Sequence, residues 1–229
     1  MTGGYRMKVF ITGISKGLGK SLCEGLKGDN EVYGLSRNKV SDINEHVEID
    51  LSKEEDVKKL ENFNEDIDLL ILNAGVLGGL RPQEETSTKE LKEIFDINVF
   101  SQKTILDILL EKNKVKQVIC ISSGAANKCR YGWGNYALSK ATLKMLMQVY
   151  AQEYKDVHFL SVAPGLIDTD MQKEVYGTDV DKVPNVQDFR DKKDNGQIES
   201  SDQIAFKIIS LIDVFRDYES GGFVDLREL

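Results

Sequence analysis

The chain has 229 residues, of which 41% are hydrophobic and only three are proline, and this length fits one domain better than two. Its net charge of -8 at pH 7 argues against binding nucleic acid or an anionic membrane through bulk electrostatics. The three cysteines and two histidines lack paired spacing, which predicts reduced thiols, a cytoplasmic location and no metal site. Polar residues and glycines in segment 1–6 predict a flexible lead-in, with the domain itself spanning 7–229.

A glycine-rich turn follows the first predicted strand, Lys8–Thr12, and precedes a helix that runs to about Leu26. Glycines let a ligand approach the backbone closely, and free N–H groups at a helix start attract phosphate. The turn therefore predicts a dinucleotide site, although such turns also serve plain helix packing. Its spacing is Gly-x-x-x-Gly-x-Gly and not the common Gly-x-Gly-x-x-Gly. Its residues are Gly13, Ser15, Lys16, Gly17, Leu18 and Gly19.

The residues after the second predicted strand, Glu31–Ser36, indicate which dinucleotide is bound. An NAD site usually carries an acidic residue there, whereas an arginine accommodates a 2'-phosphate. Here Arg37 follows the strand, and Lys16 lies in the glycine turn. A charge-assisted bond to phosphate contributes roughly 1.5–3 kcal/mol. The sequence therefore predicts NADP, and the alternative is that both side chains are solvated surface cations.

Two further predicted strands end in small or polar residues. Strand 47–49 precedes Asp50, which either caps the next helix or accepts a hydrogen bond from an adenine amino group. Strand 67–72 is apolar throughout, as expected for a central parallel strand covered on both faces. Parallel sheets place ligands at the carboxyl ends of their strands. At that end of strand 67–72 stand Asn73, Ala74 and Gly75.

Asn98 lies within a predicted helix over 88–110, on the same face as apolar residues. A buried amide must be hydrogen-bonded, so this side chain has either a structural or a functional role. The next predicted strand, 117–121, ends just before Ser123.

Tyr136 and Lys140 stand at the start of a long predicted helix, 136–154. Positions four residues apart share one face of a helix, and a nearby cation favours the ionised form of a phenol. Tyr136 is therefore a candidate to give and take a proton at working pH.

The last third of the chain contains a predicted strand over 157–162, a helix over 202–212 and a strand over 222–224. Segment 171–200 mixes apolar residues with many charges, which predicts a substrate lid or a static surface excursion. Strands alternate with helices along the whole chain. This pattern predicts an α/β fold: a doubly wound, Rossmann-type parallel sheet of about seven strands with helices on both faces.

Together these motifs resemble the short-chain dehydrogenase/reductase family from residue 7 to the end of the chain. The glycine turn, Asn-Ala-Gly, Tyr-x-x-x-Lys and Pro-Gly segments occur in the order typical of that family. The resemblance implies a Tyr136 that exchanges a proton with the substrate oxygen, and a Ser123 that hydrogen bonds to this oxygen. Lys140 would hold the nicotinamide ribose and favour the ionised phenol, and Asn98 would position a water linking Lys140 to solvent.

The resemblance also implies the residues that hold the cofactor. The glycine turn would bind the pyrophosphate, Asp50 the adenine, Asn73 the adenosine-side ribose region and Thr169 the carboxamide. The complete predicted set consists of Gly13, Ser15, Lys16, Gly17, Leu18, Gly19, Arg37, Asp50, Leu51, Asn73, Ala74, Gly75, Tyr136, Lys140, Pro164, Gly165, Ile167 and Thr169.

Within that family, the second half of the chain looks most like the sepiapterin reductase and benzil reductase group. The resembling segments are 132–133, 163–172, 189–198 and 220–225. This resemblance implies an NADPH-dependent reductase of ketones or diketones, with Trp133, Met171 and Asp225 near a small-molecule carbonyl substrate. An aspartate matching Asp225 anchors the pterin in sepiapterin reductases, although an acidic residue at a strand end also has a structural explanation.

Two rival functions are a non-catalytic NADP sensor or scaffold on the same fold, and an epimerase or dehydratase of the extended branch. The sensor is disfavoured because both Tyr136 and Lys140 are present, and the extended branch needs a longer chain. Family members usually pair through the helices over 88–110 and 136–154, which implies a homodimer or homotetramer. The apolar residues of the second helix, Leu138, Met145 and Val149, fit either a partner surface or an ordinary core.

Overall fold

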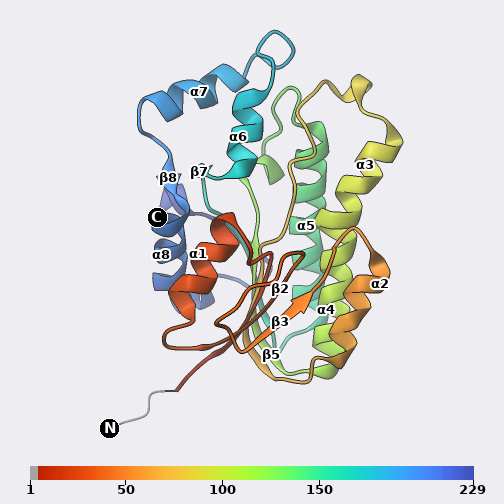
Figure 1. Cartoon of the computed structure of the whole chain (residues 1–229), viewed down its shortest axis with the longest axis vertical. Helices are drawn as coiled ribbons and strands as arrows, with labels where there is room; N and C mark the ends of the chain where they lie inside the picture. The colour runs from red at the N-terminus through yellow and green to blue at the C-terminus, as the bar shows by residue number, and fades with distance from the viewer. Residues whose placement is uncertain (1–4) are drawn as a thin grey trace.

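A computed structural model of the protein describes residues 5–229. Seven strands form one parallel sheet in the order β3-β2-β1-β4-β5-β6-β9, with helices on both sides (Figure 1). The predicted doubly wound sheet is thus confirmed. Its strands are β1 (Lys8–Thr12), β2 (Glu31–Ser36), β3 (Glu45–Glu48), β4 (Ile67–Leu72), β5 (Val115–Ile121), β6 (His158–Ala163) and β9 (Gly222–Asp225).

The sheet buries both of its faces because alternate strand residues point to opposite sides. In β1, Phe10 packs into the cluster beneath α4 (Ser101–Lys112) and α5 (Gly134–Glu153). Its neighbour Ile11 packs into the cluster beneath α1 (Gly17–Leu26) and α8 (Ser201–Ser210). Each fully buried side chain of this size contributes roughly 1.5–3 kcal/mol. The remaining helical elements beside the first cluster are α2 (Glu54–Val57), η1 (Lys58–Asn62) and α3 (Thr88–Phe95).

The strand order reverses at β1, which pairs with β2 on one side and with β4 on the other. A crevice forms at such a switch point, beyond the carboxyl ends of the strands. This edge of the sheet receives the glycine turn after β1 and the loops after β4, β5 and β6.

The helix predicted over 88–110 is interrupted by a π-helical turn, η3 (Asp96–Phe100), between α3 and α4. The N–H of Ser101 donates to the C=O of Asp96, five residues earlier. Such turns occur frequently at functional sites, and this one carries Asn98.

The predicted lid contains two helices, α6 (Asp170–Gly177) and α7 (Val186–Asp194), above the carboxyl edge of the sheet (Figure 1). A two-stranded sheet that the sequence reasoning missed, β7 (Ile167–Asp168) with β8 (Glu199–Ser200), joins the two ends of this segment. The short remaining turns are η2 (Gln83–Glu85), η4 (Gly124–Ala126), η5 (Val214–Asp217) and η6 (Leu226–Glu228).

Residues 1–4 of the predicted lead-in lie outside the described residues. The next residue, Tyr5, donates a hydrogen bond of 2.6 Å to Asp68 of β4. Among residues 5–229, no helix is long and apolar enough to cross a membrane. The same residues contain no cluster of three His, Cys, Asp or Glu side chains that could hold a metal ion.

Candidate active site

A cavity of about 530 Å³ runs along the carboxyl edge of the sheet, from the end of β2 to the start of α5. Every site residue predicted from the sequence lines this cavity except Asn98 and Asp225. The structure therefore brings together groups that lie up to 158 positions apart, from Gly13 to Met171.

The glycine turn needs its three glycines for backbone conformation and for close packing within the protein. Gly13 and Gly17 have φ angles of 76° and 55°, in the left-handed region that glycine adopts without strain. A Cβ at Gly19 would lie 2.2 Å from the Gly13 carbonyl oxygen and 2.4 Å from Nδ2 of Asn73. The glycines thus let the turn pack against Asn73, and the start of α1, where free N–H groups favour a phosphate, lines the cavity.

Asn73 fastens the end of β4 to the glycine turn. Its Nδ2 donates to the carbonyl oxygens of Thr12 (2.9 Å) and Gly13 (3.3 Å). In return, Oγ1 of Thr12 accepts from the N–H groups of Asn73 and Ala74, both at 3.0 Å. These four bonds hold two neighbouring strand ends at one spacing beside the cavity.

The cavity wall beyond β2 carries Arg37, Lys16 and Asp50. Arg37 is exposed, and Lys16 lies 3.6 Å from Asp170 in an exposed ion pair. The hydroxyl and backbone N–H of Ser52 bond to the Asp50 carboxylate and hold its pKa below the usual value. Asp50 does not cap α2, because the N-cap residue of that helix is Lys53; of the two roles weighed for Asp50, the cap is wrong.

Tyr136, Lys140 and Ser123 meet at the other end of the cavity. The Lys140 ammonium is 3% exposed, lies 5.8 Å from the Tyr136 ring centre and donates to the Ile121 carbonyl oxygen at 2.9 Å. Oγ of Ser123 accepts from the N–H of Ala125 at 3.1 Å, which leaves its own proton available to a ligand. Among the described residues, no hydrogen bond involves the Tyr136 hydroxyl and no carboxylate pairs with Lys140.

Asn98 is fully buried behind this group. Its Oδ1 accepts from the N–H of Val76 at 2.8 Å, and its Nδ2 donates to the Val76 carbonyl (2.9 Å) and to Oγ of Ser139 (3.0 Å). Ser139 in turn donates to the Tyr136 carbonyl oxygen at 2.9 Å. The amide therefore links the segment after β4 to the turn of α5 that carries Tyr136.

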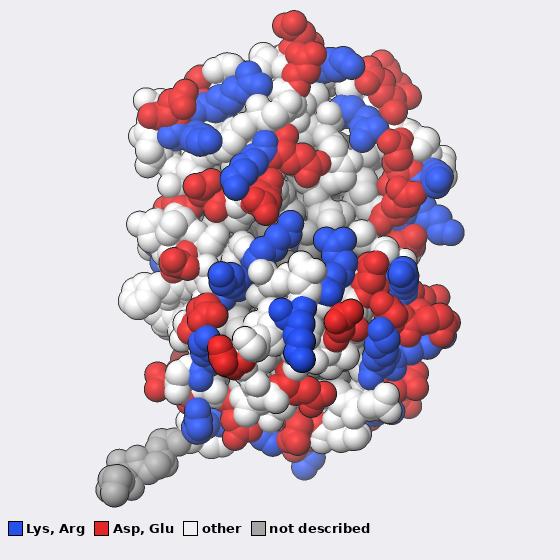
Figure 2. Space-filling model, in the orientation of Figure 1, with Lys and Arg blue, Asp and Glu red and all other residues white. Residues whose placement is uncertain are grey.

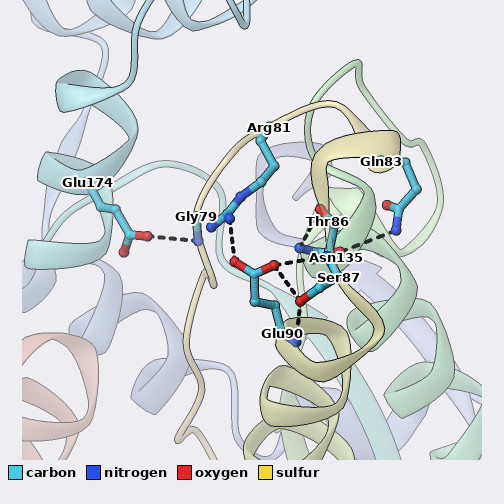
Figure 3. A network of polar contacts seen from close by, with 8 residues as sticks. All are labelled: Gly79, Arg81, Gln83, Thr86, Ser87, Glu90, Asn135 and Glu174. Atoms are coloured by element: carbon cyan, nitrogen blue, oxygen red, sulfur yellow. Dashed lines mark hydrogen bonds and ion pairs between the residues drawn. The ribbon is translucent and has the colours of Figure 1, made fainter.

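A polar network fixes the start of α5, which has no side-chain cap of its own (Figure 3). Buried Asn135 donates to Oγ1 of Thr86 at 3.2 Å. The chain then enters α3 through a capping box formed by Ser87 and Glu90, and Glu90 also pairs with Arg81. The segment before α3 and the residue next to Tyr136 are thus held by one set of bonds.

The predicted lid contacts the segments around the catalytic end of the cavity through side chains of both α6 and α7. Trp133 stacks on Phe189 of α7 with ring centres 4.9 Å apart, and its Nε1 donates to Asn185 at 2.8 Å. On the other side, Glu174 of α6 accepts from the N–H of Gly79 at 2.9 Å (Figure 3). Met171, at the start of α6, lines the cavity.

Asp225 is buried at the end of β9 and bonds to Arg227. The guanidinium and backbone N–H of Arg227 hold the pKa of Asp225 below its usual value, against the opposing effect of burial. Arg227, and not Asp225, lines the cavity. Sequence reasoning missed both Arg227 and Phe189, although Arg227 was visible as a cation two positions past a strand end.

Comparison with known proteins then decides the family. A sequence profile described as short chain dehydrogenase matches residues 7–179. The chain belongs to the short-chain dehydrogenase family. It is therefore an oxidoreductase of a family that binds nicotinamide cofactors and acts on CH–OH and C=O groups of small molecules.

This short-chain dehydrogenase has relatives in bacteria, yeast and mammals. It is 30% identical to a benzil reductase ((S)-benzoin forming) of Bacillus subtilis, over 95% of this chain and 97% of the relative. An uncharacterized oxidoreductase of Saccharomyces cerevisiae is 33% identical over 83% of this chain and 83% of its own. Its crystal structure superimposes on this protein with a TM-score of 0.84, over 96% of this chain and 95% of the yeast chain. A sepiapterin reductase of Bos taurus is 32% identical over 69% of this chain and 61% of its own. The predicted relation to the benzil and sepiapterin reductase group is thus confirmed.

Proposed function

We propose that the protein is an NADPH-dependent carbonyl reductase in which Tyr136 is the general acid. The observation that carries this proposal is the buried ammonium of Lys140 beside Tyr136 and Ser123, with no carboxylate partner among the described residues. An unpaired buried charge costs several kcal/mol. A functional role explains why the fold retains it.

The residues present fit a nicotinamide dinucleotide. The cavity is lined from the glycine turn and the start of α1 to Tyr136 and Lys140, and the close packing at Gly19 fixes the shape of that turn. The glycine turn would hold the pyrophosphate, and Asn73 and Thr169 would hold the ribose and carboxamide regions. Bound NADPH supplies a hydride to the carbonyl carbon of the substrate.

The side chains of the protein donate the proton and stabilise the charge that develops during the reaction. Tyr136 donates its proton to the carbonyl oxygen, and Ser123 donates a hydrogen bond to the same oxygen where negative charge develops. Lys140 stabilises the phenolate that Tyr136 becomes. Asn98 has its amide bonded to protein on both sides, and a role in positioning a water stays a prediction.

The preference for NADPH over NADH rests on Arg37 and Lys16, which line the cavity beyond β2 where a 2'-phosphate would lie. Losing one charge-assisted bond to that phosphate should lower the preference for NADPH by roughly tenfold or more. The Arg37→Ala variant tests this fall in coenzyme preference. Its control is Lys39→Ala, which removes an exposed cation outside the cavity and should leave the preference unchanged. Equal use of both coenzymes by the unmodified protein would contradict the NADP assignment.

For the substrate we propose a ketone or diketone, either benzil-like or a pterin side chain. The likeness to a benzil reductase and to a sepiapterin reductase supports this class. The aromatic wall formed by Trp133, Tyr136 and Phe189 also fits a flat apolar group.

The decisive experiment follows the oxidation of NADPH with benzil, sepiapterin, an isatin and simple ketones. Tyr136→Phe should abolish turnover and leave NADPH binding nearly intact, whereas Tyr131→Phe, at an exposed position outside the cavity, should retain turnover. Undiminished turnover by Tyr136→Phe would rule out the mechanism. Binding of NADPH without turnover of any carbonyl would favour the sensor alternative.

We also propose that the protein forms a homodimer or homotetramer. Leu138, Met145 and Val149 of α5 are 47%, 59% and 42% exposed, so they belong to no core within one chain. Gel filtration at micromolar concentration tests the proposal, and a monomer would refute it.

A further inference from the structure

Arg227 is fixed at the substrate end of the cavity by a buried anion. Oδ1 of Asp225 accepts from Nε of Arg227 at 2.8 Å and from its backbone N–H at 3.1 Å, and Nη2 bonds to the other carboxylate oxygen. The Asp225 side chain is 8% exposed, whereas that of Arg227 is 57% exposed. One edge of the guanidinium is therefore anchored, and its remaining N–H groups have no acceptor among the described residues.

The guanidinium lies close to the reacting groups. A Cβ at Gly124, the residue after Ser123, would lie 3.2 Å from Nη2 of Arg227. A Cβ at Gly165 would lie 3.3 Å from Cγ of the same side chain. Arg227 thus passes over two glycines and lines the cavity together with Ser123 and Tyr136.

This end of the cavity is rich in positive charge, although the whole chain carries a net charge of -8. Arg130 and Lys192 lie over the ring of Phe189, and both line the cavity, as do Lys128 and Arg227. The acidic residues that line the whole cavity are Asp50, Asp170 and Glu174. Arg130 is partly neutralised by Asp188 at 3.6 Å. In Figure 2, Lys and Arg side chains border the hollow near the centre of the face, together with Asp and Glu side chains. The cofactor phosphates do not account for these cations, because Lys16 and Arg37 line the opposite end.

We infer that the substrate is an oxo acid whose carboxylate is bound by Arg227, and that Asp225 is a positioning residue that orients Arg227. This inference rests on the proposed carbonyl reductase function. The planar fork of an arginine matches the two oxygens of a carboxylate. An oxo acid is a ketone that also carries a carboxylate, so the inference narrows the ketone class of the proposed function.

The reaction remains a simple reduction. Hydride from NADPH adds to the keto carbon, the proton of Tyr136 goes to the keto oxygen, and the carboxylate is unchanged. The products are a hydroxy acid and NADP⁺, and solvent returns the proton to Tyr136.

The test compares two charged substrates with their neutral esters: benzoylformate and 3-benzoylpropionate, each beside its methyl ester. The unmodified protein should show a higher kcat/KM for at least one acid than for its ester. Arg227→Gln should lower kcat/KM for that acid by roughly tenfold or more, and should change kcat/KM for the ester and for benzil by less than about threefold. An acid-to-ester ratio that does not change in Arg227→Gln overturns the inference.

Arg227→Gln leaves the buried Asp225 carboxylate without its partner, which could impair folding. Two further variants distinguish a folding defect from the loss of carboxylate binding. The double variant Asp225→Asn/Arg227→Gln removes that charge and should show the same fall in the acid-to-ester ratio. Asp225→Asn alone should lower the ratio less, because Arg227 remains but is no longer held. The control Arg216→Gln removes one positive charge outside the cavity, where Arg216 bonds to Gln117, and should leave the ratio unchanged.

The outcomes separate this inference from the proposed function. If no carbonyl compound, charged or neutral, supports NADPH oxidation, the reductase proposal fails and this inference fails with it. If the esters and benzil are reduced and the acids are not preferred, only the carboxylate inference fails.

Discussion

Replacing Asn98 by alanine should destabilise the whole protein as well as impair turnover. The substitution removes three hydrogen bonds, two to the backbone of Val76 and one to Oγ of Ser139. Asn98 and Ser139 are both fully buried. The N–H and C=O of Val76 lose their partners, and a small side chain at residue 98 supplies no replacement.

The expected size of this effect follows from the cost of unpaired polar groups. Each buried donor or acceptor left without a partner costs about 1–3 kcal/mol. For the two groups of Val76, which is half-buried, we expect a loss of about 2–4 kcal/mol in the free energy of unfolding. Domains are stable by only about 5–15 kcal/mol. At this chain length, the loss corresponds to a fall in Tm of roughly 5–15 °C.

Urea unfolding followed by circular dichroism, together with thermal melting, measures this change. Asn195→Ala is the matched control, because Asn195 is exposed at the end of α7 and should change stability by less than about 0.5 kcal/mol. A free energy of unfolding for Asn98→Ala equal to that of the unmodified protein would show that the three bonds contribute nothing net. Asn98 would then act in turnover alone.

Two further predictions follow from local geometry. Gly19→Ala should abolish cofactor binding or folding, because its Cβ would lie 2.2 Å from a carbonyl oxygen. The control Gly28→Ala, whose Cβ would have no atom within 4 Å, should be neutral or slightly stabilising. Cofactor titration and thermal melting compare the two variants, and normal binding by Gly19→Ala would contradict the packing argument. Burial raises the pKa of the Cys120 thiol to about 11, whereas Cys129 is exposed. A thiol reagent at pH 8 should therefore modify Cys129 rapidly and Cys120 only after unfolding. Rapid modification of both thiols in the native protein would show that the core opens.

The sequence predicted the groups whose spacing is local. Tyr136 and Lys140 are four residues apart, and the glycine turn is one short segment between a strand and a helix. Their chemistry is visible without the fold, and the doubly wound parallel sheet followed from strands alternating with helices. Most predicted cofactor residues stand directly after strands, so their meeting at one sheet edge was also predictable.

The sequence could not predict contacts that depend on distant partners. Asn98 bonds to Val76 and Ser139, which are 22 and 41 positions away, and the sequence alone identified neither partner of the predicted buried amide. The apolar periodicity over 88–110 predicts one continuous helix and gives no sign of the π-helical turn around Asn98. Arg227 stands only two positions after Asp225 in the sequence, yet its place beside Gly124 and Gly165 comes from the pairing of β9 with β6.

Trp133 is the single tryptophan of the chain, and it lies between Tyr136 and Phe189. Its ring is 8% exposed and packs with residues of α6 and α7 in one small apolar cluster. Any movement of α7 away from the cavity must separate the stacked rings and change the surroundings of the indole. The fluorescence of Trp133 should therefore report any movement of α7 at the mouth of the cavity, without a label and without a substitution.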